Sequence, residues 1–369
     1  MIGEQPRIAF LTSSNAAGGA ELMAHRLAQW MAERGWPVYL FAGSTHPLWE
    51  ATSGDRLTVI DAASVRNFVR RIEDEHIRCM FVNSSRDLRL AVRGAWLRRP
   101  ACPLVMLQHM QPGRRKRDPL HALLFSKLRY WVSPLQGLAD LTHRATGIPY
   151  EKIRVIPHGI ELRRFLQPAI DRATARTVFG LPSDAAVIGN VGRLDYGKGQ
   201  VHLLEALAIL RRRGRNVVAL IVGDETAGES QNTASHLRAR VDALGISDAT
   251  FFHAARPDVE TAFRAMDIFA LTSLSETYGL VTIEAMASGL PVIGTRSAGT
   301  PELLDDGRTG LLVPPADSAA LASAIEGLLE NSILARTLSD SARHEAMLRF
   351  SHSAQCEALE VLISDALKS

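Results

Sequence analysis

The 369-residue sequence predicts an α/β protein built from two doubly wound domains. The chain is longer than one hydrophobic core usually supports, so two domains of ordinary size are expected. Short β-branched and apolar runs alternate with amphipathic segments throughout, which is typical of parallel strands joined by crossover helices. The strand runs fall into two sets with a proline-containing segment between them, so each set is expected to form a Rossmann-like sheet.

The first set holds six candidate strands, separated mostly by helical patterns. They are Arg7–Thr12, Pro37–Ala42, Leu57–Ile60, Cys79–Asn83, Leu104–His109 and Tyr130–Ser133. Because ligands of doubly wound sheets gather at the carboxyl ends of the strands and at helix N-termini, motifs at those ends carry the most weight.

The second set holds six more candidate strands. They are Ala186–Val191, Val217–Val222, Thr250–His253, Ile268–Thr272, Pro291–Thr295 and Gly310–Val313. The three prolines of segment 156–182 place the boundary near Gln167, which gives an N-terminal domain over 1–167 and a C-terminal domain over 168–352. Three helical patterns follow Pro315, and the last, roughly Ser353–Leu367, has no strand after it to cover. Residues 353–369 are therefore expected to form a helix that returns to the first domain.

Composition narrows the class of protein. With 46% apolar and 22% charged residues, the chain can bury substantial cores and shows no tract typical of disorder. No apolar run approaches the roughly 18 to 20 residues of a membrane helix, and the first twenty residues lack the pattern of a secretory signal, so a cytosolic protein is expected. The three cysteines are odd in number and widely spaced, which argues against a disulfide framework and a zinc site.

The net charge of +3 is the sum of a positively charged half and a negatively charged half of the chain. Residues 1–165 carry 24 Lys and Arg against 14 Asp and Glu, a net +10, whereas the remainder carries 18 against 25, a net −7. A positive half suggests an anionic partner. The densest run of positive residues in this half can be a solvated loop, as such runs usually are. Near an anionic membrane, however, each cation contributes about 1 kcal/mol to binding. That run consists of Arg114, Arg115, Lys116 and Arg117. Nucleic-acid binding is disfavoured, because no aromatic platform or recognised module accompanies the charge.

The strongest motif is SETYGLVTIEAMASGLPVIGT, residues 275–295, a loop that runs into a helix after a strand. Gly279 relieves steric hindrance at the turn, and the amides of Gly279, Leu280 and Val281 become first-turn donors suited to a diphosphate. Glu276 precedes the helix and Glu284 lies within it, so they can accept hydroxyl protons from different parts of a ligand. Alternatively, Glu276 only complements the helix dipole and Glu284 is a solvated helix residue.

A second motif, NVGRLDYGKGQ at 190–200, follows the first strand of the second domain. Arg193 and Lys198 lie five apart in a glycine-punctuated loop, where both can turn toward the same phosphates. Fixed cations of this kind stabilise a departing diphosphate without a metal. The alternative is a surface loop with two solvated cations.

Two features of the first domain complete the candidate site. Gly18 and Gly19 open an amphipathic helix after the first strand and could let a phosphate or sugar approach the backbone, although a lone GG pair is weak evidence. His109 ends the strand LVMLQH, and a single histidine there is as readily structural as functional.

The sequence resembles glycosyltransferase family 4 of the GT-B fold along nearly its whole length, from the GG turn through IPHGIE to GRTGLLVPPAD. The family motif is two glutamates separated by seven residues, with an aromatic-Gly pair after the first, here Glu276, Tyr278, Gly279 and Glu284. Tyr278 stands where Phe is usual. The resemblance implies two Rossmann-like domains that face each other across a cleft.

The resemblance also implies roles for the site residues. Glu276 is expected to bind donor-sugar hydroxyls, Glu284 the ribose, and Arg193 with Lys198 the diphosphate. The backbone over 279–281 is expected to contact sugar and phosphate, and His109 to lie beside the donor sugar.

The implied activity is retaining, metal-independent transfer from a nucleotide-diphosphate sugar, UDP- or GDP-linked, to a glycan or lipid-linked acceptor in bacterial surface polysaccharide or lipopolysaccharide synthesis, with no further cofactor. The enzyme is expected in the cytoplasm or peripherally on the inner face of the membrane. Two alternatives stay open: another enzyme on the same fold, such as a nucleotide-sugar epimerase or a phosphorylase, and a non-catalytic sugar-nucleotide-binding subunit.

Overall fold

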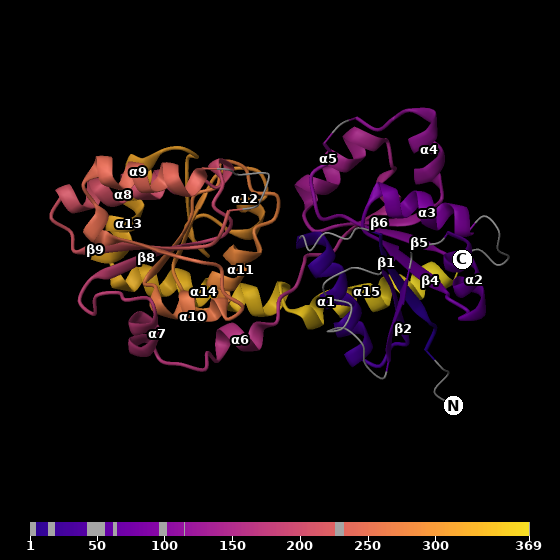
Figure 1. The fold of residues 1–369 in the computed structure, drawn as a ribbon. Coiled ribbons are helices and arrows are strands. Elements are labelled where there is room, and N and C mark those ends of the chain that lie inside the picture. The colour runs from indigo at the N-terminus through magenta and orange to yellow at the C-terminus, as the bar shows by residue number, and fades with distance from the viewer. Residues whose placement is uncertain are drawn as a thin grey trace. The chain divides into compact units, whose positions relative to one another are not determined.

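The structure is a computed structural model that describes residues 5–13, 19–42, 56–61, 65–95, 102–113, 115–225 and 232–368. The chain divides into two compact units (Figure 1). Unit 1 comprises Met1–His158 together with His352–Ser369, and unit 2 comprises Gly159–Ser351. The sequence placed the boundary near Gln167, and the division falls at His158/Gly159.

Unit 1 is built on a parallel sheet of seven strands in the order β3-β2-β1-β4-β5-β6-β7. The strands are β1 (Ile8–Thr12), β2 (Val38–Ala42), β3 (Leu57–Asp61), β4 (Cys79–Val82), β5 (Leu104–Leu107), β6 (Leu128–Ser133) and β7 (Ile153–Val155). Most of their apolar residues are buried on both faces, as expected of a parallel sheet covered by helices, whereas Val155 at the sheet edge is exposed. Phe10 of β1 lies directly opposite Phe81 of β4, and the two rings stack at 4.8 Å.

Helices connect these strands and cover the sheet. They are α1 (Gly19–Glu33), α2 (Val65–Asp74), α3 (Ser85–Ala95), α4 (Pro119–Ser126) and α5 (Gln136–Thr146), and the short turn η1 (Tyr150–Lys152) precedes β7. A core cluster joins α2, α3 and α4 to the sheet, with the Phe41 and Phe68 rings in edge contact at 5.0 Å. Burying one such ring stabilises the fold by about 1.5–3 kcal/mol.

The last helix, α15 (His352–Leu367), belongs to unit 1 and packs against α1. The carboxylate of Glu360 accepts two hydrogen bonds from Arg34, each 2.9 Å long, and a third from the indole of Trp36 at 3.0 Å. Near the other end of α15, the hydroxyl of Tyr130 donates to Asp365. The helix is therefore attached to both α1 and the sheet of unit 1.

Unit 2 holds a second parallel sheet of six strands, in the order β10-β9-β8-β11-β12-β13. The strands are β8 (Ala186–Val191), β9 (Val217–Val222), β10 (Thr250–His253), β11 (Ile268–Leu271), β12 (Val292–Thr295) and β13 (Leu311–Val313). On one face lie α8, α9 and α13, and on the other α10, α11 and α14 (Figure 1).

The helical elements of unit 2 span a range of lengths. They are α6 (Leu162–Leu166), α7 (Arg172–Val178), η2 (Tyr196–Lys198), α8 (Gln200–Arg212), α9 (Thr233–Leu244), η3 (Ser247–Ala249), α10 (Val259–Ala265), α11 (Leu280–Ala287), α12 (Thr300–Leu303), α13 (Ser318–Glu330) and α14 (Ser332–Arg349). Among the described residues no helix combines the length and apolarity needed to cross a lipid bilayer.

All twelve predicted strands are present, with ends that differ by up to two residues. The sequence missed β7, which has three residues and pairs with β6 at the edge of the sheet. It extended β5 too far: the strand ends at Leu107, so His109 lies in the loop that follows. Segment 156–182, read as a connection, contains α6 and α7 of unit 2.

Candidate active site

The order of strands in unit 2 brings two of the predicted motifs together. The chain winds outward from β8 in one direction and from β11 in the other, so a topological switch point lies between these neighbouring strands. Ligands of doubly wound sheets bind outside the carboxyl ends of the strands at such a point. The loop after β8 carries Arg193 and Lys198, and the loop after β11 carries Glu276.

Backbone contacts hold these two loops against each other. Gly199 has φ +64°, and a Cβ at this position would lie 2.2 Å from the carbonyl oxygen of Thr272. Glycine therefore permits both the left-handed turn and the close approach of the loops. The hydroxyl of Thr272 donates to the carbonyl of Lys198 at 2.9 Å, and the amide of Leu274 donates to the carbonyl of Gly197 at 2.8 Å.

Lys198 and Glu276 form an ion pair where the loops meet. The Lys198 Nζ donates to Glu276 Oε2 at 2.6 Å, and the hydroxyl of Ser273 donates to the same oxygen at 3.1 Å. Glu276 is 8% exposed, and its carbonyl accepts from the amide of Gly299 at 2.8 Å. The carboxylate is thus held by backbone and side-chain contacts, beside a cation that an incoming anion can share.

Helix α11 begins directly after this pair. Gly279 is its N-cap, with φ +81°, and a Cβ there would lie 3.0 Å from Glu276 Cγ. The first-turn amides of Leu280 and Val281 have no carbonyl within the helix to bond, so they suit an anionic ligand. Glu284 lies further along α11 and is half-buried. Lys198, Glu276 and the start of α11 therefore lie together at the carboxyl end of the sheet, with an ion pair beside free-ended helix amides.

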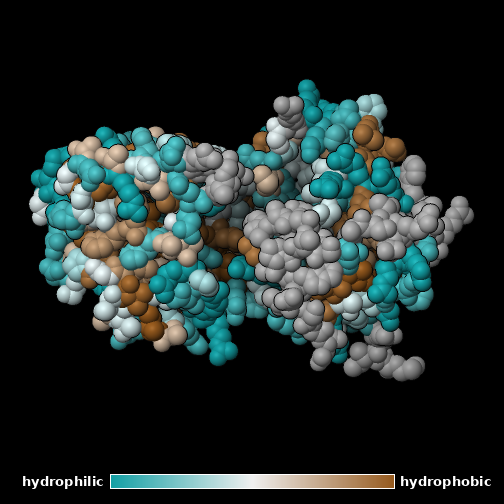
Figure 2. Space-filling model, in the orientation of Figure 1, coloured by the Kyte–Doolittle hydropathy of each residue, from teal (hydrophilic) through white to brown (hydrophobic). Residues whose placement is uncertain are grey.

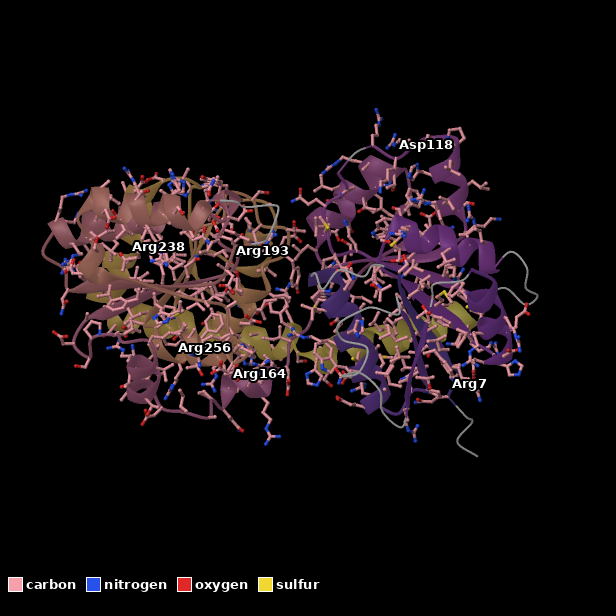
Figure 3. All side chains as sticks on the ribbon, viewed as in Figure 1. Arg7, Asp118, Arg164, Arg193, Arg238 and Arg256 are labelled. Carbon is pink, nitrogen blue, oxygen red and sulfur yellow. The ribbon has the colours of Figure 1, made fainter. Side chains whose placement is uncertain are left out.

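A pocket of about 280 Å³ opens beside this end, at the carboxyl ends of β8 and β9 and the loop after β10. Its lining residues are Val191, Gly192, Arg193, Val222, Gly223, Asp224, Glu225, Ala255, Arg256 and Val259. Figure 3 labels Arg193 and Arg256 in this unit. Arg193 was predicted from the sequence, whereas Asp224 and Arg256 were not, although both follow strand ends, where ligands of such sheets gather.

Arg256 is held rigidly at the edge of the pocket. Its Nε and Nη2 donate to the two carboxylate oxygens of Asp258 at 3.0 and 2.8 Å, and its guanidinium lies 5.3 Å from the centre of the Phe179 ring. The hydrogen bonds from Arg256 lower the pKa of Asp258 to about 2. The arginine is consequently positioned before any ligand enters.

Unit 1 contains its own polar cluster around His109. The His109 Nε2 lies 2.9 Å from Asn83 Oδ1, and its ring stacks on that of His158 with 5.2 Å between centres. Desolvation lowers the pKa of His109 to about 4, opposed by the nearby carboxylate of Glu21. Desolvation, followed by the neighbouring His109, lowers the pKa of His158 to about 3. Both rings are neutral at pH 7. The positions of Asn83 and His158 beside His109 were not predicted from the sequence.

The remaining predicted positions of unit 1 are only partly described. Gly18 and Arg114 lie outside the described residues, while Gly19 opens α1. Arg115 and Arg117 are exposed, whereas the Lys116 Nζ donates to the Ser85 hydroxyl at 2.9 Å.

Two Rossmann-like parallel sheets, each with a candidate site at its strand ends, place the chain in the GT-B fold class. A glycosyltransferase from Rickettsia africae ESF-5 superposes with a TM-score of 0.87 at 18% identity, covering 99% of both chains. Anabaena Alr3699/HepE in complex with UDP superposes with a TM-score of 0.82 at 25% identity, covering 97% of this chain and 100% of that one.

Both halves of the chain match glycosyltransferase families. Residues 17–164 match Glycosyltransferase Family 4, and residues 171–345 match Glycosyl transferases group 1. The two matches together extend over most of the chain and show a glycosyltransferase of the family 4 type.

The curated relatives that it resembles include D-inositol 3-phosphate glycosyltransferases. That of Corynebacterium jeikeium (strain K411) is 38% identical over 218 residues, which make up 58% of this chain and 52% of the relative. That of Corynebacterium efficiens is 35% identical over 241 residues, 64% of this chain and 56% of the relative. The chain thus spans about half the length of the curated relatives that it matches.

Proposed function

We propose that the chain transfers a sugar from a nucleotide-diphosphate sugar to an acceptor, with retention of anomeric configuration and without a metal. The observation that carries this proposal is the Lys198–Glu276 pair of 2.6 Å, held beside the start of α11 at the switch point of unit 2. The solved structures of Anabaena Alr3699/HepE with UDP and with UDP-glucose support a nucleotide-sugar donor.

The candidate residues of unit 2 have separate roles in this reaction. Lys198 and Arg193 bind the diphosphate together with the backbone over 279–281, and Glu284 accepts hydrogen bonds from the ribose hydroxyls. The pocket beside Arg193 and Arg256 holds the nucleoside. A diphosphate that binds Lys198 competes with Glu276 for its ammonium group, which leaves the Glu276 carboxylate available to sugar hydroxyls.

The chemical step follows from where charge develops. As the bond between the anomeric carbon and the phosphate oxygen breaks, negative charge grows on the leaving nucleoside diphosphate, and Lys198 and Arg193 stabilise it more strongly than in the ground state. The acceptor oxygen attacks the face from which the phosphate leaves, and its proton passes to a phosphate oxygen of the donor. Retention then needs no carboxylate nucleophile.

The acceptor is proposed to be anionic or lipid-linked, as in bacterial surface polysaccharide or lipopolysaccharide synthesis, because residues 1–165 carry a net charge of +10. The relatives named D-inositol 3-phosphate glycosyltransferases point to a phosphorylated polyol as one acceptor to test. The rival functions remain a nucleotide-sugar epimerase and a non-catalytic binding subunit.

The test is a donor screen followed by a transfer assay. Thermal unfolding with UDP- and GDP-linked sugars identifies the donor, because a ligand that binds only the folded state raises the melting temperature. With that donor, release of the nucleoside diphosphate in the presence of inositol phosphates or lipid-linked glycans reports transfer, and NMR of the product gives its anomeric configuration. Product with inverted configuration would contradict retention. Binding without turnover would favour the binding subunit, and an isomerised donor would favour the epimerase.

A peripheral membrane location is proposed for the same enzyme. Leu120 and Leu123 of α4 are 56% and 48% exposed, and the exposed Arg115 and Arg117 precede them in the chain. Figure 2 shows hydrophobic atoms over α4, and Figure 3 labels Asp118 at its start. Apolar side chains beside cations suit the surface of an anionic bilayer.

Cosedimentation with phosphatidylglycerol vesicles at low salt tests this location. The chain is expected to bind these vesicles but not neutral phosphatidylcholine vesicles, and Arg115→Ser with Arg117→Ser is expected to weaken binding. Equal absence of binding to both vesicle types would rule the membrane location out.

A further inference from the structure

The amide of Asn83 has its orientation fixed by two partners in unit 1. Its Nδ2 donates to the carbonyl oxygen of Leu11 in β1 at 3.0 Å, so its Oδ1 is the atom that faces His109 Nε2 at 2.9 Å. An amide oxygen only accepts hydrogen bonds. The proton of a neutral His109 ring must therefore reside on Nε2.

The same pair of contacts lies at the switch point of the first sheet. Asn83 follows β4 and bonds to β1, the two strands between which the order of that sheet reverses. His109 comes from the loop after the neighbouring strand β5. Ligands of doubly wound sheets bind at such a point.

We propose that Asn83 is a positioning residue that holds His109 as the Nε2–H tautomer, so that the ring offers a substrate hydroxyl only the lone pair on Nδ1. The hydrogen bond from a substrate hydroxyl to Nδ1 rests on the proposed function, whereas the assignment of the tautomer does not. His109 then accepts a hydrogen bond from a sugar hydroxyl and acts neither as a donor through Nδ1 nor as a cation.

The groups packed around the ring agree with a neutral His109. His158, from the segment after β7, stacks on the ring, and stacking with a second imidazole disfavours a positive charge on either. Glu21 of α1 is the carboxylate that favours the charged form, and burial outweighs it. Gln355 of α15 approaches His158 Nδ1 at 3.5 Å, on the second ring and not on His109.

The first experiment reads the tautomer directly in the unmodified protein. In ¹⁵N-histidine-labelled protein, the His109 resonances are those that disappear in His109→Gln. We expect Nε2 to carry the proton and Nδ1 to be unprotonated throughout pH 6–8. A proton on Nδ1, or a charged ring in this range, would overturn the proposal. This measurement needs neither a substrate nor a variant of Asn83.

The second experiment uses Asn83→Asp, which retains an oxygen acceptor but adds a negative charge. The carboxylate favours the charged ring, so the NMR pKa of His109 is expected to rise toward neutrality. Since turnover needs the neutral ring, the acid limb of the kcat profile should move to higher pH by the same amount. If the kcat profile of the variant coincided with that of the unmodified protein despite a raised His109 pKa, the proposed role of His109 in turnover would be wrong.

The third variant, Asn83→Leu, removes the acceptor. We expect a mixture of tautomers and a kcat lowered by about tenfold, because the half-buried ring then lacks its fixed partner. Circular dichroism and the calorimetric melting transition of unit 1 establish that the variant is folded. Asn216→Leu, at an exposed asparagine of unit 2 whose amide donates to Asp184 at 3.2 and 3.3 Å, is the control and should leave kcat and the His109 resonances unchanged. Unchanged kcat in Asn83→Leu would contradict the proposal. If no nucleotide sugar is turned over at all, the proposed function fails while the tautomer measurement still decides the state of His109.

Discussion

Lys198 and Glu276 neutralise each other in the structure, and the loss of one charge is expected to cost more stability than the loss of the other. Glu276 is almost buried, so loss of Lys198 leaves a carboxylate whose remaining side-chain partner among the described residues is the Ser273 hydroxyl. Loss of the carboxylate charge instead leaves a partly exposed ammonium group, which water can solvate. An unpaired buried charge is the more costly of the two.

We therefore predict different effects for the two substitutions. Lys198→Met should lower turnover by about 100-fold or more, because a cation that stabilises the leaving group is lost, and should also lower the melting temperature of unit 2. Glu276→Gln should lower turnover by a similar factor with little change in melting temperature. Steady-state kinetics and calorimetry check both, with Lys368→Met as the control. Near-normal rates in both variants would refute the site assignment.

The stacked His109 and His158 make the stability of unit 1 depend on pH. Their folded-state pKa values, about 4 and about 3, lie below the unfolded value of 6.5. The unfolded state therefore binds more protons as pH falls below 6.5, and stability decreases down to the folded pKa values. Each ring contributes up to about 1.4 kcal/mol per pH unit in that window.

The prediction is a melting temperature of unit 1 that falls between pH 6.5 and pH 4 and is flat between pH 7 and 8. Replacing His158 by Gln should reduce that slope by about half, because one of the two titrating rings is removed. Calorimetry at constant ionic strength measures it. A slope unaffected by the substitution would mean that other groups cause the dependence.

At the scale of elements, the loop after β8 depends on Gly199 for its approach to the loop after β11. Gly180 has the same left-handed backbone, φ +63°, but no atom of the described residues lies within 4 Å of a Cβ there. Comparing alanine at the two positions separates backbone strain from steric collision. Gly180→Ala should cost about 1 kcal/mol through φ alone.

Gly199→Ala is expected to cost more, about 3 kcal/mol, because the added methyl group meets the carbonyl of Thr272. It should also raise the KM for the donor, since Lys198 immediately precedes the displaced residue. Urea denaturation and donor kinetics measure the two effects. Equal destabilisation by both variants would show that the loops tolerate a side chain between them.

The elements show how far sequence reasoning reaches. Long apolar runs such as Val217–Val222 predicted their strands to the residue, because burial on both faces leaves an unambiguous pattern. The short strand β7 escaped notice because three residues at a sheet edge form no period. Lys198 and Glu276 are 78 residues apart, and only the order of the strands brings them into contact.

The pairing of Asn83 with His109 could not have been predicted for a similar reason. Each residue follows a different strand, and an asparagine at a strand end carries no pattern of its own. The glutamate motif and the Arg193–Lys198 loop were predictable because glycines mark the turns that they need. Their roles in turnover stay predictions until the variants are measured.

At the scale of the whole molecule, the two units have separate cores and are expected to respond separately to a nucleotide. The predicted donor residues other than His109, Gly18 and Gly19 lie in unit 2. UDP at 100 times its Kd should stabilise unit 2 by about 2.7 kcal/mol. Hydrogen exchange should show the slowing concentrated in β8, β9 and α11. Equal slowing in β1 and β5 would contradict separate responses.

Helix α15 gives the chain an unusual order of assembly. The strands of unit 1 leave the ribosome before those of unit 2. Helix α15, which packs against α1 and bonds Arg34 through Glu360, is synthesised after all of unit 2. During synthesis unit 1 therefore lacks α15, and the surface of α1 that this helix covers stays exposed, whereas unit 2 can already fold completely. In a nascent chain that ends at Ser351, unit 2 should thus be folded and unit 1 incompletely folded.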